Sequence, residues 1–533
     1  MKQRYLVFFY SLFLCLIFFQ VTTKDTFAQS RATGADLIGV IKDPSGGVIS
    51  GANIVVRNPE TNFERAITAN EDGSYQFLAL RPGTYELIVS APGFADYKQL
   101  FNLVLGSIGS LDVTMNIAGE SNIIVVTGTK VVETTKSAVT QTVDSTRIDN
   151  LPINGRNFLG FAFINALIGR DNPPPLGPAP TTGLNFAGQR ARSNLVQVDG
   201  ADNIDNGSKG ARSTISQEAV QEFQVVINSF AAEYGRTAGG VVNIVTKSGT
   251  NEFHGNAFGF LRQRAIQARN ALAFPPVGAN PKPAFTRGQY GFTFGGPIKR
   301  DKTFFFLSLD QTRRRESGFS DIGRDSTLFD LTPAQQAFIA NNPSIGNLYG
   351  MFARSGATVA RTGIEPTTGA AVFLPTFLAS NGQLGAIPGI FRTFTNAQNV
   401  YPIKDDFTFY SAKVDQQINL NNRLSARYNF TPITTTGIQS SGQNQPFGLN
   451  DVSRTGVSSI RDTAAVVQLT SILDNTKINE FIFNFGRRSA TFSSSADVAI
   501  NIPGAAFFGR EPFSPASRQE RVYEIKDNFS YII

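Results

Sequence analysis

The chain has 533 residues, with 48 Lys and Arg against 41 Asp and Glu, and it contains one His and one Cys. That count excludes most zinc sites, which need three or four clustered ligands, and a catalytic triad or dyad would have to use His254. Only 17% of the residues are charged, while Phe and Gly are abundant, at 46 and 49. This composition favours an exported β protein that is not an enzyme, with no catalytic residues, no cofactor, no metal and no nucleic-acid partner.

Residues 1–28 are typical of a secretory signal peptide. Two basic residues precede an apolar run over 5–19, and a small-residue cleavage site ends at Ala28, before Gln29. The run is shorter than the ~20 residues of a membrane-spanning helix. Cleavage would also remove Cys15, the only cysteine of the chain.

Residues 34–118 have the pattern of a small β-sandwich. Strand-length apolar segments alternate with Gly, Pro and Asp turns every 8–12 residues, which predicts about seven strands. The segment resembles the carboxypeptidase regulatory-like domain, a transthyretin-like fold that is also grouped with carbohydrate-binding-like sandwiches. Its aromatic residues can either pack in the core or stack on a sugar. The resemblance depends on Gly39, Asp43, Gly46, Gly51, Ala52, Asp72, Gly73, Tyr75, Phe77, Leu80, Pro82, Gly83, Tyr85, Gly93 and Phe94.

Residues 121–129 read SNIIVVTGT, a β-branched run that periodicity alone cannot interpret. An extended segment in this position can add as a strand to the sheet edge of a partner. The run resembles the Ton box of TonB-dependent outer-membrane receptors, and the alternative is an internal strand of the sandwich. The resemblance implies that TonB contacts Ile123, Ile124, Val125, Val126 and Thr127.

Residues 137–247 resemble the α+β plug domain of the same receptors. Leu151-Pro152 and Gly155-Arg156 lie in a segment expected to form an early helix and strand, and a Pro/Gly-rich tract over 171–183 is expected to be a mobile loop. An Arg-rich strand is then followed by a strand that ends in Asp199-Gly200. The most specific stretch is 216–255, in which residues from Glu222 to Lys247 carry the match.

Residues 248–533 show alternating segments of ~10 residues, the pattern of transmembrane β-strands. The connectors alternate between long and short, as in outer-membrane barrels, and His254 is expected to be structural. Arg313 to Arg315 and Arg487-Arg488 are expected at strand ends, facing lipid headgroups or lipopolysaccharide. Eight strands are predicted, near 252–261, 287–295, 302–311, 405–418, 422–430, 461–473, 476–489 and 520–532.

Alternation within these strands predicts which side chains share a face. In 289–295 and 423–430 the apolar residues point one way and the polar residues the other. In 479–486 Ile482 is an exception, because it lies among the polar positions.

The barrel segment resembles the Oar-like receptors, which carry an N-terminal regulatory-like domain. The barrels of outer-membrane transporters have ~22 strands, and eight strands leave no room for a plug. We therefore expect the sequence to be truncated in its barrel. The predicted fold is mostly β: a transthyretin-like sandwich, an α+β plug and part of an antiparallel transmembrane β-barrel.

The resemblance implies a receptor in the bacterial outer membrane, with plug and sandwich on the periplasmic side. Such a receptor contacts lipid and lipopolysaccharide, binds an unidentified extracellular solute, such as an oligosaccharide or another large nutrient, and takes it up with energy delivered through TonB and its inner-membrane motor. Two alternatives are an Oar-like surface adhesion or assembly protein without uptake, and a secreted glycan-binding β protein.

Overall fold

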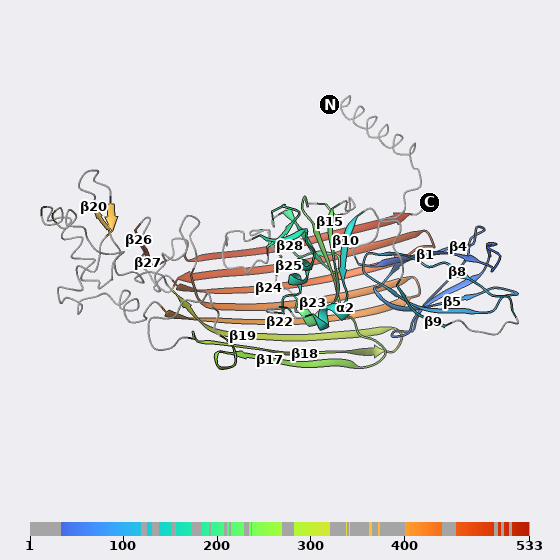
Figure 1. Cartoon of the computed structure of the whole chain (residues 1–533), viewed down its shortest axis with the longest axis horizontal. Helices are drawn as coiled ribbons and strands as arrows, with labels where there is room; N and C mark the ends of the chain where they lie inside the picture. Colours follow the sequence, from blue (N-terminus) through green and yellow to red (C-terminus); the bar gives the residue numbers. More distant parts are fainter. Residues whose placement is uncertain are drawn as a thin grey trace, which may run out of the picture.

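The computed structural model describes residues 33–118, 125–130, most of 138–268, 282–319, 400–439, 455–494 and 514–531, with short pieces within 337–373 and 499–510. A sheet of long strands carries a small mixed domain over its middle and a β-sandwich at one end (Figure 1). The mostly β fold class is therefore confirmed. The expected signal peptide lies outside the described residues.

The N-terminal sandwich consists of two sheets. One has the order β4-β1-β7, with β8 also paired to β1, and the other has the order β3-β2-β5-β6-β9. The sandwich region thus has eight strands rather than about seven, and a ninth joins from the following segment. The strands are β1 Ala35–Lys42, β2 Asn53–Asn58, β3 Phe63–Thr68, β4 Ser74–Leu80, β5 Gly83–Ser90, β6 Tyr97–Leu103, β7 Ile108–Ser110, β8 Val113–Thr114 and β9 Val125–Lys130.

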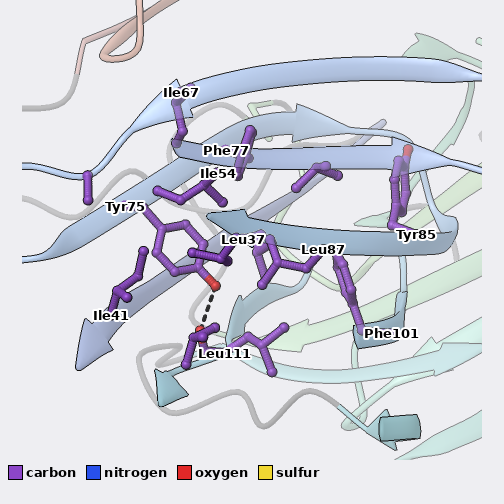
Figure 2. Packing of buried hydrophobic residues seen from close by; sticks show 14 of the residues in the cluster. Leu37, Ile41, Ile54, Ile67, Tyr75, Phe77, Tyr85, Leu87, Phe101 and Leu111 are labelled. Carbon is purple, nitrogen blue, oxygen red and sulfur yellow. Dashed lines mark hydrogen bonds between the residues drawn. The ribbon is translucent and has the colours of Figure 1, made fainter. Parts of the chain in front are cut away.

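The core of the sandwich is filled by side chains from alternate strand positions of both sheets (Figure 2). The Tyr75 hydroxyl donates a hydrogen bond to the Leu111 carbonyl at 2.6 Å, which satisfies the polar tip of a buried ring. Burial raises the pKa of Tyr75 above its usual value. Tyr85 stacks on Phe101 with 6.0 Å between ring centroids. These aromatic residues therefore serve the core and do not form an exposed surface for stacking on a sugar.

The second part is a five-stranded sheet of order β10-β15-β16-β13-β14, accompanied by short helices and a two-stranded pair, β11-β12. The prediction of a strand after the early helix is wrong for residues 158–164, because these residues form a 3-10 helix. The Asn157 side chain accepts a hydrogen bond from the Leu159 N–H at 3.1 Å and caps that helix. The expected loop at 171–183 lies almost entirely outside the described residues. The elements are β10 Val139–Val143, α2 Ser145–Asn150, η2 Phe158–Ile164, β11 Ile168–Asp171, β12 Gly183–Phe186, β13 Leu195–Val198, β14 Ala201–Asp202, η4 Gln217–Ala219, β15 Val220–Asn228 and β16 Val241–Thr246.

The third part is an antiparallel sheet whose eight strands are the eight predicted ones, in the predicted order. Consecutive strands join through short turns at 300–302, 420–421 and 473–476, and through long connectors at the other end, so the long–short alternation is confirmed. Most strands extend beyond the prediction on the side of the long connectors. The elements are β17 His254–Gln263, η5 Arg264–Ile266, β18 Phe285–Lys299, β19 Thr303–Phe319, β22 Val400–Asn419, β23 Asn422–Gln439, β24 Thr455–Ile472, β25 Lys477–Ser494 and β28 Ala516–Tyr531, with two small pairs, β20 Thr362–Ile364 with β21 Ala371–Phe373 and β26 Ala499–Ile502 with β27 Ala506–Gly509.

The two faces of this sheet differ as the alternation predicts. Tyr290 and Phe292 on β18 are 45% and 44% exposed, whereas Gln289 on the other face is buried. Ile482, the exception on β25, is buried because it packs against Ala201 of the second part. In the part of the chain that the structure describes, no helix is long and apolar enough to cross a membrane.

Candidate functional site

A two-residue turn brings the second part, which we call the plug, against the polar face of the sheet. β13 and β14 form a hairpin in which Val198 pairs with Ala201, and the loop residues Asp199 and Gly200 both have positive φ, at 49° and 76°. Asp-Gly is the preferred sequence of such a turn. A Cβ on Gly200 would lie 2.7 Å from Ile482 Cδ1, and the positive φ at this position also favours glycine.

Asp199 is the centre of a buried group of charges that we call the Asp199 cluster: Asp199, Thr246, Lys413 and Arg427. Arg427 Nε lies 2.6 Å from one carboxylate oxygen, and the Thr246 N–H and hydroxyl donate to the carboxylate at 2.9 and 2.8 Å. The Lys413 ammonium lies 3.8 Å from the Asp199 carboxylate and donates to the Thr246 carbonyl at 3.0 Å. Burial alone would raise the pKa of Asp199, but Lys413 and Arg427 outweigh it and hold the pKa below its usual value. Asp199 is therefore an ionised carboxylate that joins the plug to β22 and β23.

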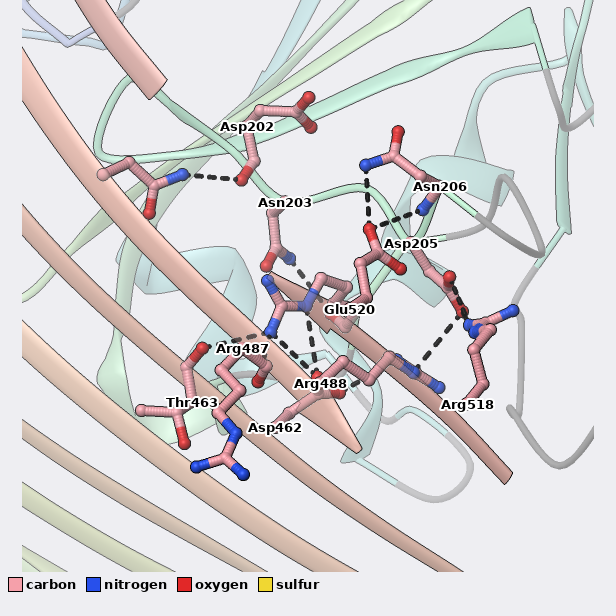
Figure 3. Close-up of polar contacts among 12 residues, drawn as sticks. Asp202, Asn203, Asp205, Asn206, Asp462, Thr463, Arg487, Arg488, Arg518 and Glu520 are labelled. Carbon is pink, nitrogen blue, oxygen red and sulfur yellow. Dashed lines mark hydrogen bonds and ion pairs between the residues drawn. The ribbon is translucent and has the colours of Figure 1, made fainter. Parts of the chain in front are cut away.

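A second group, the Asp462 cluster, contains Asp205, Arg212, Asp462, Arg488 and Arg518 (Figure 3). Asp462 on β24 accepts from Arg212 of the plug at 2.9 Å and from Arg488 of β25 at 2.9 Å. Asp205 of the plug lies 3.4 Å from Arg488 and accepts from Arg518 of β28 at 2.6 Å. The side chains of Asp205, Asp462 and Arg488 are almost fully buried. The ion pairs thus form one chain, Arg212–Asp462–Arg488–Asp205–Arg518, that crosses between plug and sheet three times and is buried up to its last member, Arg518.

The structure corrects the expectation for Arg487-Arg488 twice: both residues lie mid-strand in β25 rather than at a strand end, and they do not share a face. Arg487 is exposed, as a residue on the lipid face should be, whereas Arg488 is buried and faces the plug. Neighbouring residues of a strand point to opposite faces, so the pair cannot face lipid together.

A third contact joins the plug to the first barrel strand. Arg156 forms an ion pair with Glu218, and its guanidinium lies 4.9 and 4.7 Å from the ring centroids of Phe258 and Phe260 on β17. Asn256 of β17 donates to Glu218 at 2.8 Å. Arg156 therefore joins the plug to the sheet, while its neighbour at 155 lies outside the described residues.

The sandwich also contacts the plug, along β15. The Leu105 N–H donates to Glu222 at 2.8 Å, and Gln224 donates to the Leu105 carbonyl at 2.8 Å. Gly106 has φ 66°, and a Cβ there would lie 2.5 Å from the Gln224 side chain. Glycine therefore allows the sandwich backbone to reach the plug.

Glu222 makes this contact sensitive to pH. Burial raises the pKa of Glu222 to about 7, against the opposing effect of the Leu105 hydrogen bond and with a smaller contribution from Asp144. The folded protein therefore retains this proton at pH values where an exposed Glu has lost it. Stability from this group is present at low pH and is lost as the pH rises toward about 7.

We predict that the urea midpoint for unfolding of the plug is higher at pH 5 than at pH 8, and that Glu222→Gln removes most of that difference. The Gln carbonyl still accepts from Leu105, while its side chain does not titrate. Glu86→Gln, on β5 of the sandwich, is the control for loss of one carboxylate. An unchanged pH profile in Glu222→Gln would contradict the assignment.

The predicted TonB-contact residues are only partly described. Val125, Val126 and Thr127 belong to β9, which pairs in parallel with β6, whereas Ile123 and Ile124 lie outside the described residues. β9 is the last strand of its sheet. This pairing is the arrangement expected for the alternative, a strand of the sandwich, and the Ton-box assignment stays a prediction.

His254 and the acidic residues show no metal-binding arrangement. His254 Nδ1 lies 3.2 Å from the Thr250 hydroxyl and 3.0 Å from the Glu252 carbonyl, at the start of β17. Over the described ranges, no group of three or more His, Cys, Asp or Glu side chains is placed to hold a metal ion.

Sequence reasoning missed the members of the Asp462 cluster. It placed Arg427 on the polar face of β23, but it did not pair that residue with Asp199, which is 228 positions earlier in the chain. The predicted bounds hid the signal, because Asp462 and Arg488 are each one residue from the end of predicted strands 461–473 and 476–489. In the structure both lie mid-strand in β24 and β25, where a charge needs a partner on the lumen side.

Two family descriptions match the chain. "Outer membrane beta barrel domain" matches residues 245–533, and "Carboxypeptidase regulatory-like domain" matches residues 36–116. The first covers more than half of the chain and includes all eight long strands.

Two curated relatives are similar over part of their length. The chain is 26% identical to the TonB-dependent transporter Oar of Myxococcus xanthus over 292 residues, which are 53% of this chain and 25% of that protein. It is 36% identical to the probable TonB-dependent siderophore receptor PirA of Acinetobacter baumannii over 85 residues, 14% of this chain and 11% of that one. The chain thus spans a quarter or less of the length of these relatives.

Solved structures of outer-membrane receptors are also similar. The Escherichia coli transporter YddB matches with a TM-score of 0.45 at 11% identity, covering 74% of this chain and 45% of that one. The siderophore receptor PirA from A. baumannii matches with a TM-score of 0.35 at 16% identity, covering 73% and 54%.

Proposed function

The chain belongs to the outer membrane β-barrel family and is located in the bacterial outer membrane, and from this premise we propose that it acts as a TonB-dependent receptor and transporter. In this proposal residues 137–247 are a plug that blocks the lumen of the barrel. Energy from TonB, delivered at residues 121–129, remodels the plug and admits a solute. No bond is made or broken, so no catalytic group is needed.

The observation that supports this proposal best is the burial of charged plug residues against the strands. Three charged plug residues form ion pairs with five residues of the sheet. Asp199 pairs with Lys413 and Arg427. Asp205 pairs with Arg488 and Arg518, and Arg212 pairs with Asp462. A buried ion pair contributes little net stability compared with apolar packing, but breaking one is costly. Buried ion pairs of this kind keep the plug in place at equilibrium, and an external energy source is needed to break them.

The remaining partners are part of the same proposal. The solute is an oligosaccharide or another large nutrient, bound on the outer side by plug and long connectors. The sandwich (34–118) and the plug lie on the periplasmic side, because the sandwich contacts the short-turn end through Asn62 and Asp301. The barrel, residues 248–533, contacts lipid and lipopolysaccharide with its aromatic outer face.

Uptake is expected to depend on the proton-motive force. Cells that produce the receptor should bind fluorescent oligosaccharides with or without a protonophore, but should accumulate them only without it. A strain lacking TonB should behave like the protonophore-treated cells. Accumulation that persists in both conditions would contradict energy coupling. Binding without accumulation in untreated cells would instead favour a surface adhesion or assembly role.

The exported protein is expected to begin near Gln29 and to fractionate with outer membranes. N-terminal sequencing of the membrane fraction checks the first statement, and density-gradient separation checks the second. Recovery of correctly processed protein in the soluble periplasmic fraction would contradict the proposal.

A further inference from the structure

The sandwich is docked on the plug and on the barrel strands by polar contacts at several separate places. Thr33 donates to Glu480 of β25 at 2.6 Å, and Asn62 donates to Asp301 at 2.9 Å in the β18–β19 turn. Leu105 contacts β15, as described above. Asn62 and Asp301 also line a half-open chamber of about 740 Å³, together with Arg81 and Asp415.

Arg81 is the charged residue through which the sandwich reaches the barrel. It lies between β4 and β5, and its carbonyl accepts a hydrogen bond from the Tyr85 hydroxyl at 3.0 Å. The adjacent Pro82 carbonyl accepts from Gln221 of the plug at 3.0 Å. With its backbone held on both sides, the Arg81 side chain donates to Ser248 at 3.2 Å and forms an ion pair with Asp415 of β22.

Asp415 is next to the Asp199 cluster. It is two residues after Lys413 on the same strand, so both side chains point to the same face. Asp415 is 3% exposed and Lys413 is 5% exposed. Lys413 interacts electrostatically with both Asp199 and Asp415. A small pocket lined by Arg81, Asp199 and Lys413 connects the two sites.

We propose that the sandwich holds the plug closed through Arg81, by keeping Asp415 neutralised so that Lys413 stays with Asp199. When the sandwich leaves, Asp415 loses the guanidinium of Arg81, and Lys413 is the next cation that acts on it. Lys413 then turns toward Asp415 and its hold on Asp199 weakens. Release of the sandwich therefore loosens the plug at the Asp199 cluster.

This role goes beyond the proposed function, because it concerns retention of the plug and requires neither TonB nor a solute. Its test can therefore fail while the transport proposal stands, and the reverse is also true.

The test measures how often the plug separates from the barrel wall. Ala201 of the plug is 2% exposed and packs on Val466 and Ile482, so Ala201→Cys reports separation by its rate of reaction with fluorescein maleimide in isolated outer membranes. The only natural cysteine, Cys15, lies in the expected signal peptide. In this background Arg81→Gln should raise the labelling rate about tenfold, because a buried charge has lost its partner.

The double variant Arg81→Gln/Asp415→Asn distinguishes this relay from simple adhesion. Without the carboxylate at 415, Lys413 has no competing partner, so the labelling rate should return close to that of the Ala201→Cys parent. Lys42→Gln, at the far end of β1, controls for loss of a positive charge and should leave the rate unchanged. If the labelling rate of Arg81→Gln is no higher than that of Lys42→Gln, the proposal is overturned. If the double variant labels as fast as Arg81→Gln, Arg81 only attaches the sandwich and the relay is equally overturned.

Discussion

Replacing Val125 with proline is expected to abolish energy-coupled uptake and to remove binding to TonB, while the receptor still assembles in the outer membrane. Strand addition to a partner depends on backbone N–H and C=O groups. Proline removes one N–H and fixes φ, so it disrupts an extended pairing segment. Val125→Ala keeps the backbone and should have a mild effect. Co-purification with the C-terminal domain of TonB measures the loss directly, without knowledge of the solute.

The pairing of β9 with β6 makes a second measurement necessary. Val125 lies opposite Lys98 in that parallel ladder, so proline also weakens the edge of the sandwich sheet. Edge strands are the part of a sheet that can detach while the remaining strands stay paired, as donor-strand recognition requires. We therefore expect residues 33–118 to remain protease-resistant in Val125→Pro. If the sandwich becomes protease-sensitive, the segment is an internal strand of the sandwich. If TonB binding is unchanged, the Ton-box assignment is wrong.

Asp462→Ala is expected to weaken retention of the plug more than any change at an exposed ion pair. It leaves Arg212 and Arg488 buried with only part of their partners, and breaking a buried pair costs about 3–5 kcal/mol. With an m-value of about 2 kcal/mol per M, the urea midpoint for trypsin cleavage of the plug should fall by about 2 M.

Asp474→Ala is the matched control for Asp462→Ala. Asp474 pairs with Lys477 at 2.8 Å in an exposed turn between β24 and β25, where solvent screens the interaction. Its urea midpoint should be unchanged. Equal midpoints for the two variants would show that the Asp462 cluster does not hold the plug.

The sequence alone determined the features that repeat at short range. Transmembrane strands alternate with period two, so the positions of all eight strands and the faces of three of them could be predicted, including the exposure of Tyr290 and Phe292 and the burial of Arg427. The glycine and proline turns likewise identified the sandwich. In each case the information lies within about ten neighbouring residues, where local sterics and burial act.

Only the tertiary structure decided what these elements contact. Ile482 is apolar on a polar face because Ala201 of the plug covers it, and Arg488 is buried because Asp462 and Asp205 meet it there. The helix at 158–164, the pairing of β9 with β6 and the docking of Arg81 on Asp415 have the same origin. The partners are separated by tens to hundreds of residues, and a charged side chain carries no local signal of which opposite charge it will meet. Which opposite charges become partners is decided when the plug packs against the sheet and the sandwich packs at its end. A charge can be buried there only if an opposite charge is buried beside it.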